Sequence, residues 1–306
     1  MPERWRKAGT LVIGFVLISA LLASTPRPVD ALVSPEEISS PAAEVRLAFS
    51  PDGRQILWGS IGRDGEADQQ DIWERHRTPT GWSAPARVSF DTPAVDFDPA
   101  ISADGRTVYF HSDRPGGYGG TDLYKVARDP RSLRFGAPVN LGPTINSAGE
   151  EWAPTPLRDG GLIFSSDGWG GFGRHDLFVT RAGMKRPHNL GPAVNGSAED
   201  FDAALSPDGA SLVFSSGTMS ETAANVRLFA ASWRSGRPTG RTPLAIGCSD
   251  FVIGASFDPA NPNSFYYAAR CAGGRGRMDI WRTRFARPER PGAVNRPNRG
   301  QGGERR

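Results

Sequence analysis

The sequence predicts an all-β fold, a five-bladed β-propeller of four-stranded antiparallel blades, with a six-bladed ring as the alternative. Three observations support this prediction: a composition rich in turn residues, a repeat, and two landmarks that share its period. The chain has 306 residues, of which 37 are Gly and 26 are Pro, and 38% are hydrophobic. No long stretch after residue 31 keeps the apolar period of a helix, so strands and turns are favoured.

The first landmark is an aspartate in a tight turn of the Ser-Pro-Asp-Gly type. It recurs at spacings of 52, 55, 49 and 50 residues, as Asp52, Asp104, Asp159, Asp208 and Asp258. The second landmark is a charged residue before two apolar ones, and it recurs at 51, 54, 51 and 52, as Asp71, Asp122, Asp176, Arg227 and Asp279. A period of this length fits a propeller blade better than one coil of a solenoid.

The stretch 96–126 shows the order of elements inside one repeat. Strands are expected at Phe97–Ser102, Arg106–Ser112 and Asp122–Val126, because each is rich in β-branched and aromatic residues and is bounded by turn residues. A fourth, outer strand is least distinct, and none is convincing after Asp279. Glu36–Ser39 is expected to supply it, closing the ring and removing exposed sheet edges.

The two ends of the chain differ from the repeats. Basic residues precede an apolar run over residues 11–23, and Val29-Asp30-Ala31 offers small residues at the positions that a signal peptidase reads. Residues 1–31 are therefore expected to be a signal peptide that is cleaved after Ala31. An uncleaved membrane anchor is the alternative, because the run is short for a membrane span of about 20 residues. The propeller is expected over 32–285, with inner strands starting near 45, 97, 152, 201 and 251, and 286–306 as a disordered basic tail.

Charge argues against a nucleic-acid surface. The net charge of +3 combines +2 at residues 1–31 and +4 at 286–306, which leaves −3 for the residues between them. A nucleic-acid-binding surface concentrates Lys and Arg on one face of a protein. The net negative charge of the residues between the two ends does not favour such a surface.

A family resemblance follows from the repeated motifs. These motifs follow one order: an acid, an aromatic residue and the Asp-Gly turn, followed by the run SDRPGGYGGTDLY at 112–124 and by Asn-Leu-Gly-Pro at 140–143 and 189–192. In this order the chain resembles the WD40-like β-propeller repeats related to the TolB propeller. The resemblance covers about residues 36–285. It implies a periplasmic or cell-envelope propeller that binds partners without catalysis. No N-terminal α/β domain like that of TolB is recognisable.

An acidic residue lies eight positions before each turn aspartate, with an apolar residue next to it. These acids are Glu44, Asp96, Glu151, Asp200 and Asp250, and Asp98 and Asp202 lie beside two of them. We expect them around one mouth of the central channel, on the face that carries the long loops. Two readings stay open: the mouth binds a basic peptide segment of an envelope protein, or the acids bond backbone N–H groups and join blades. Ca²⁺ is a weaker alternative, and no other cofactor or metal is expected.

The long loops carry aromatic side chains, Tyr118, Trp169 and Phe172, which could cap a blade or contact a glycan or peptide. Gly168–Gly173 matches a dinucleotide-binding pattern, but it joins two strands and lacks the helix that such a site requires. No catalytic motif is present, although channel carboxylates also occur in glycan-cleaving propellers. Cys248 and Cys271, the only cysteines, are expected to form a disulfide in an oxidising compartment.

Together these features predict an exported, non-catalytic propeller that acts as a protein-binding scaffold in the periplasm or cell envelope. The alternative is a glycan-binding or glycan-cleaving propeller that uses the carboxylates of the channel mouth.

Overall fold

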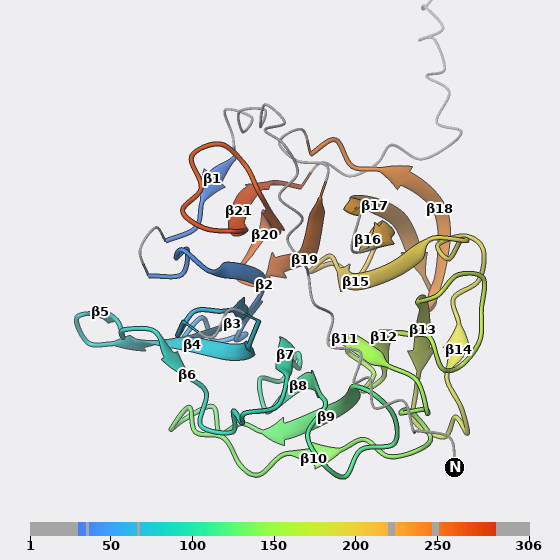
Figure 1. Cartoon of the computed structure of the whole chain (residues 1–306), viewed down its shortest axis with the longest axis horizontal. Helices are drawn as coiled ribbons and strands as arrows, with labels where there is room; N and C mark the ends of the chain where they lie inside the picture. Colours follow the sequence, from blue (N-terminus) through green and yellow to red (C-terminus); the bar gives the residue numbers. More distant parts are fainter. Residues whose placement is uncertain (1–29, 35–36, 66–67, 220–223, 247–250, 286–306) are drawn as a thin grey trace, which may run out of the picture.

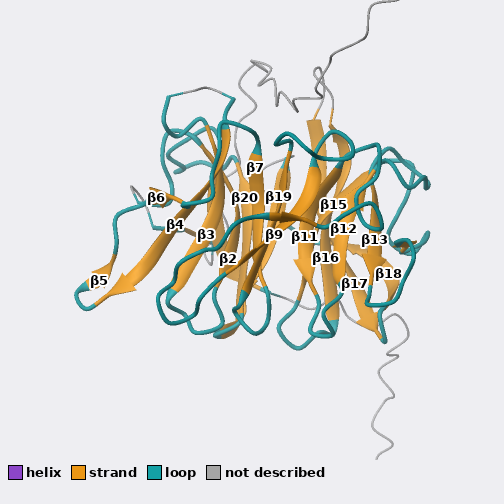
Figure 2. Ribbon diagram, turned by 90° about the horizontal axis from the view of Figure 1, so that it is seen from below, coloured by secondary structure: helices purple, strands orange, loops and turns teal. Residues whose placement is uncertain are grey.

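The computed structural model describes residues 30–34, 37–65, 68–219, 224–246 and 251–285, and these form five sheets around a central axis (Figure 1). The described residues contain strands and turns and no helix, so none of them forms a helix that could span a membrane. Each sheet is antiparallel, and Figure 2 shows the strands standing side by side with loops at both ends. The prediction of five blades, rather than six, is confirmed.

The blades follow the order of the sequence, and each is described from its inner to its outer strand. Blade 1 has β2 (Ala43–Phe49), β3 (Gln55–Ile61), β4 (Gln70–Thr78), and the short β5 (Gly81–Trp82) and β6 (Ala86–Arg87). Blade 2 has β7 (Asp96–Ile101), β8 (Thr107–Ser112), β9 (Asp122–Ala127) and β10 (Val139–Asn140). Blade 3 has β11 (Glu151–Pro156), β12 (Leu162–Ser166), β13 (Asp176–Thr180) and β14 (His188–Asn189).

Blade 4 has β15 (Glu199–Leu205), β16 (Ser211–Met219), β17 (Ala224–Arg234) and β18 (Arg237–Pro243). Blade 5 has β19 (Val252–Asp258), β20 (Asn261–Ala269), β21 (Asp279–Arg284) and, as its outer strand, β1 (Ala31–Leu32).

The turn aspartates form the inner hairpins as expected. In blade 2 the Asp104 carboxylate accepts hydrogen bonds from the Ser102 hydroxyl at 2.6 Å and the Arg106 N–H at 3.0 Å. Gly105 has a φ of 71°, which glycine adopts without strain. We call the end of the ring that carries these turns the turn face, and the opposite end the loop face.

An N-terminal strand closes the ring, but not at the expected position. Ala31 pairs with Arg282 and Leu32 with Trp281, whereas the expected Glu36–Ser39 does not form this strand. Glu36 lies outside the described residues, and Glu37 and Ile38 lie in a turn whose N–H groups donate to Ser34 O. Ile38 packs in the hydrophobic core instead, so its apolar side chain indicates a buried residue and not a strand that pairs with blade 5.

The core lies between neighbouring sheets. One cluster joins blades 1 and 2 through Leu57, Ile72, Val108 and Phe110, and another joins blades 3 and 4 through Ile163 and Phe214, among others. Because each blade buries its faces against its neighbours, stability is shared around the ring. The segments expected to be a signal peptide (1–31) and a basic tail (286–306) lie outside the described residues, apart from residues 30 and 31.

Candidate functional site

The repeated acids are buried inside the blades. Glu44, Asp96, Glu151 and Asp200 each have 0% exposed surface. Each accepts a hydrogen bond from the backbone N–H four residues earlier, in the segment that enters its blade; the donors are Ser40, Thr92, Ser147 and Gly196. Burial raises the pKa of all four carboxyls, that of Glu44 to about 7. Their oxygens are therefore engaged within the fold.

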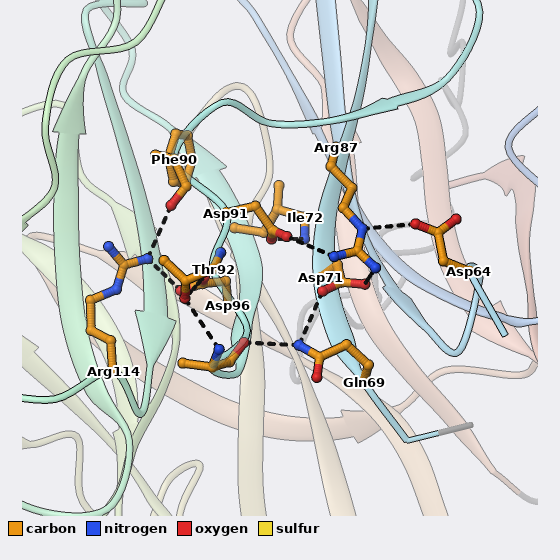
Figure 3. Close-up of polar contacts among 11 residues, drawn as sticks. Asp64, Gln69, Asp71, Ile72, Arg87, Phe90, Asp91, Thr92, Asp96 and Arg114 are labelled. Carbon is orange, nitrogen blue, oxygen red and sulfur yellow. Dashed lines mark hydrogen bonds and ion pairs between the residues drawn. The ribbon is translucent and has the colours of Figure 1, made fainter. Parts of the chain in front are cut away.

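Figure 3 shows this arrangement at Asp96. The Thr92 N–H and hydroxyl donate to one carboxylate oxygen at 2.8 and 2.7 Å, and Arg114 donates to the other at 2.5 Å. Arg114 also donates to Phe90 O at 3.3 Å. Because residues 90–94 lead from blade 1 into blade 2, Asp96 fixes the connection between the two blades.

A second ion-pair group lies beside Asp96 in the same view. Arg87 contacts Asp64 at 2.9 Å, Asp71 at 3.1 Å and Asp91 at 3.4 Å. Burial, followed by the charge of Asp71, raises the pKa of Asp91 to about 7. This group joins β4 to the same inter-blade connection.

Blade 5 departs from the expected ring of five acids. The pairing of the inner strand shifts once in each of blades 1 to 4, and the repeated acid lies two residues before this bulge. Blade 5 has two such shifts, of which the one at Gly254 matches the others. In blade 5 the bulge is at Gly254, so the matching residue is Val252 and not Asp250, which lies outside the described residues. Counting back from Asp258 fails because Asp258 lies four residues after the bulge, whereas the turn aspartates of the other blades lie six residues after theirs.

The residues after the acids, and not the acids, line the centre of the loop face. A cavity of about 250 Å³ opens there, which we call the loop-face pocket. Its apolar wall comes from all five inner strands, through Val45, Phe97, Trp152, Phe201 and Ile253. Alternation along each strand explains this: the acid turns into the blade, so its neighbour turns to the axis.

The bulge residues form a ring of left-handed backbone around the axis. Their φ values lie between 49° and 65°, at Arg46, Asp98, Ala153, Asp202 and Gly254. Left-handed backbone costs about 1 kcal/mol or more for a residue other than glycine, and such strain often occurs at functional sites. The five bulges bring charged side chains from blades 1, 2 and 4 to the axis.

Arg46 joins three blades below the loop-face pocket. Its guanidinium donates to Pro154 O at 2.9 Å, to the Thr155 hydroxyl at 2.8 Å and to Ala203 O at 3.3 Å, and it lies 3.8 Å from the Asp202 carboxylate. Arg46 lines a second, wider cavity of about 1290 Å³ on the turn face, whereas Asp202 lines the loop-face pocket. The Arg46–Asp202 pair therefore lies between the two cavities.

Asp98 and His111 complete the floor of the loop-face pocket. The His111 Nδ1 lies 3.6 Å from Asp98, and both residues are almost completely buried. Burial and then the nearby Asp202 carboxylate raise the pKa of Asp98, whereas Arg46 opposes the rise. Burial raises the pKa of Asp202 as well, and burial and Arg46 lower the pKa of His111 to about 3. Imidazole at this position is therefore neutral.

The rim of the pocket is also acidic. Asp113 is exposed and accepts the Val95 N–H at 2.7 Å, and Glu150 is half-buried. Both residues line the pocket, and no Lys or Arg does so in the part of the chain that the structure describes. The acids that meet the pocket are thus Asp98, Asp113, Glu150 and Asp202, of which the sequence predicted Asp98 and Asp202 as additions to the ring.

The loop aromatics separate into two kinds. Tyr118 and Phe172 occupy matching loops and are 50% and 53% exposed. Trp169 instead packs beside a core cluster, and its indole N–H donates to Ile145 O at 2.9 Å. Cys271 is buried and disulfide-bonded, and Cys248 lies outside the described residues.

Comparisons with known proteins show the fold. No protein-family model and no characterised protein sequence matches the chain. TolB from Acinetobacter baumannii matches with a TM-score of 0.50 and 19% identity over 80% of this chain and 55% of that one. This chain therefore spans about half the length of that TolB. An endo-arabinase from Bacteroides thetaiotaomicron matches with a TM-score of 0.54 and 12% identity, over 83% of this chain and 99% of that one. The chain shares their β-propeller fold.

Two sets of important side chains were missed by sequence reasoning. Arg46 follows Glu44 by two residues, as Asp98 follows Asp96, and this repeated offset was the available signal. Asn146 and Asn195 lie three residues after the two Asn-Leu-Gly-Pro motifs. The side-chain amide of each accepts the N–H and donates to the C=O of a third-strand leucine, Leu123 or Leu177. The equal distance of these two asparagines from their motifs was the sequence signal that could have identified them.

Proposed function

We propose that this chain is an exported, non-catalytic β-propeller of the WD40-like repeat type, which binds a basic segment of a partner protein in the periplasm or cell envelope. The observation that carries the proposal is the composition of the loop-face pocket. Its walls are apolar and aromatic, and its charged lining residues in the described chain are all acidic.

The size of the pocket suits one side chain. Pockets for drug-sized ligands have volumes of about 300–1,000 Å³, and this cavity of about 250 Å³ falls below that range. A cation over an aromatic face gains about 0.5–2 kcal/mol, and Phe97, Trp152 and Phe201 are the aromatic residues that line the pocket. A guanidinium or ammonium group from a partner would meet the rim acids Asp113 and Glu150 and then the floor acids.

The raised pKa values give this binding a pH dependence. Burial raises the pKa of Asp98, and burial with the nearby carboxylates raises the pKa of Glu150 to about 7. A cation favours the ionised form of both acids, so its binding releases protons and strengthens as the pH rises. We therefore expect tighter binding at pH 8 than at pH 6.

Affinity capture from envelope extracts tests the proposal. The wild type and Asp113→Asn would be compared, because the amide of this variant keeps an oxygen that can accept the Val95 N–H while losing the charge. Asp104→Asn, on the turn face, is the matched control. We expect a captured protein to be lost with Asp113→Asn and to be displaced by an arginine-containing peptide. Equal recovery with all three forms would remove the loop-face pocket from the account.

A second candidate is a glycan-cleaving propeller, favoured by one observation. Asp98 and Asp202 come from separate blades, line one pocket and both have raised pKa values, and glycosidases use such a carboxyl pair as acid and base. The Arg46 and Gly254 contacts of Asp202 favour a positioning role instead. Hydrolysis of aryl glycosides by the wild type and not by Asp98→Asn would favour this candidate over the first.

A further inference from the structure

Three side chains that can bind metal meet at the loop-face end of blade 3. Glu150 precedes β11, Asp167 follows β12 and His175 precedes β13. One ligand atom from each lies within 4.8 Å of the others, and His175 Nε2 lies 3.6 Å from Glu150 Oε2. Two ligands of one tetrahedral ion are about 3.4 Å apart when each bond is about 2.1 Å, so a small movement of Asp167 would bring all three onto one ion.

The local structure holds these side chains in place. The Glu150 N–H donates to Asp167 Oδ1 at 2.8 Å, and the imidazole of His175 stacks on Trp152 with 3.7 Å between ring centres. A side chain at position 149 would collide with Asp167 Oδ1, so Gly149 permits this close approach. Fixed orientation of ligands by neighbouring groups is typical of metal sites.

His175 supplies an independent indication of a ligand. The residue has 0% exposed surface, and neither ring nitrogen has a hydrogen-bond partner. A buried polar group without a partner costs about 1–3 kcal/mol, so it requires an explanation. Burial keeps the pKa of His175 well below its ordinary value, and the neutral imidazole has the lone pair that a metal ion binds.

The other four blades serve as an internal comparison. Strand pairing identifies the matching positions, which hold no second triad: Ala43, Ile61 and Gln70 in blade 1; Val95, Asp113 and Thr121 in blade 2; Glu199, Gly217 and Val226 in blade 4; Phe251, Arg270 and Met278 in blade 5. In blade 2 Asp113 accepts the Val95 N–H, as Asp167 accepts that of Glu150. The aspartate is thus part of the repeat, but the addition of Glu150 and His175 is not required for a blade to form.

We propose that Glu150, Asp167 and His175 bind one divalent first-row transition-metal ion, such as Zn²⁺, at the rim of the loop-face pocket. One imidazole and two carboxylates suit Zn²⁺, and they differ from the all-oxygen set that Ca²⁺ prefers. Three protein ligands leave a coordination position open, and Glu150 itself lines the pocket. The ion would add positive charge at this rim. The metal site is inferred from the triad alone and does not rest on the proposed partner. Because Glu150 belongs to both sites, a bound ion would weaken the binding of a cationic segment at this rim.

Calorimetric titration of the full chain with ZnCl₂, supported by quenching of tryptophan fluorescence with CoCl₂, tests this site. We expect one ion per chain for the wild type, and affinity at least about tenfold lower for Asp167→Asn and Glu150→Gln. Asp167→Asn keeps an oxygen for the Glu150 N–H, and its melting temperature without metal reports whether it folds. His188→Ala, which removes an exposed histidine of the same blade, is the matched control and should bind like the wild type.

Absence of wild-type binding up to about 1 mM Zn²⁺ would overturn the proposal. Equal affinity in the wild type and in a folded Asp167→Asn would overturn it as well, because the ion would then bind elsewhere. Loss of peptide binding in Asp113→Asn with Zn²⁺ binding retained would separate the partner site from the metal site.

Discussion

Removal of the charge at Asp96 should destabilise the propeller through the connection between blades 1 and 2. In Asp96→Asn one carboxylate oxygen becomes an amide that cannot accept from Arg114 or Thr92. Each hydrogen bond to a charged group contributes about 1.5–3 kcal/mol. Burial has already raised the pKa of Asp96, and Arg114 keeps its contacts with Phe90 O and Ser112, so we expect a loss near 2 kcal/mol and not the sum.

A double-mutant cycle with Arg114→Met separates this contact from other effects. For a domain of this size about 2 kcal/mol lowers the melting temperature by about 4–8 °C, which thermal unfolding by circular dichroism resolves. The double variant should lose about 1 kcal/mol less than the two single losses combined, because the two side chains are in contact. Asp68→Asn, at an exposed loop position, is the control and should change stability by less than about 0.5 kcal/mol. Additive losses would refute the coupling of Asp96 to Arg114.

Three further predictions concern pH, ring closure and a loop. Burial raises the pKa of Glu44 and Asp91 to about 7, so the folded state holds these two protons more tightly than the unfolded state does. The stability that the two carboxyls contribute is therefore present at low pH and is lost as the pH rises through 7. The melting temperature should therefore be higher at pH 6.5 than at pH 8 by about 3 °C or more, and Glu44→Gln should reduce the difference; a higher value at pH 8 would contradict this. A chain that starts at Ser34 should melt several degrees below one that starts at Leu32, since it lacks the Leu32–Trp281 pairing and the 3.0 Å bond from Val33 N to Ile280 O; equal melting would show that β1 does not close the ring. Gly119→Ala should cost about 1–3 kcal/mol in denaturant unfolding because its Cβ would meet the backbone oxygens of Gly149 and Ser147, whereas Gly136→Ala, with 3.6 Å to its nearest atom, should be tolerated; equal stability would refute the steric argument.

The fold could be predicted because the same sequence pattern recurs in all five blades. The turn aspartates and the third-strand landmarks repeat the same local chemistry, so errors in one blade are corrected by the others. Blade 5 lacks the Asp-Gly turn, and Asp258 lies two residues closer to the bulge than the other turn aspartates, so counting back from it led to Asp250 and not to the matching Val252. The closing strand was misplaced because Ile38, which is buried, and Leu32, which is paired, are both apolar in sequence.

The site was harder to predict because it depends on which way each side chain turns. Glu44 and Asp96 begin their inner strands as expected, but the pleat turns them into the blades and gives the axis to Val45 and Phe97. Arg46 and Asp98 reach the axis only because the backbone bulges there, and no propensity scale assigns left-handed φ to arginine. The triad of Glu150, Asp167 and His175 spans 26 positions of sequence and becomes visible only when three strand ends meet.

The central claim is that the loop-face pocket recognises a positive charge. Titration of the wild type with an acetylated Gly-Arg-Gly amide, and with the same peptide carrying citrulline, isolates that charge because the two side chains have almost the same shape. We expect saturable binding of the arginine peptide that is stronger at pH 8 than at pH 6, is weakened in Asp113→Asn and is unchanged in Asp104→Asn. Equal binding of the arginine and citrulline peptides, or binding that Asp113→Asn leaves unchanged, would contradict it.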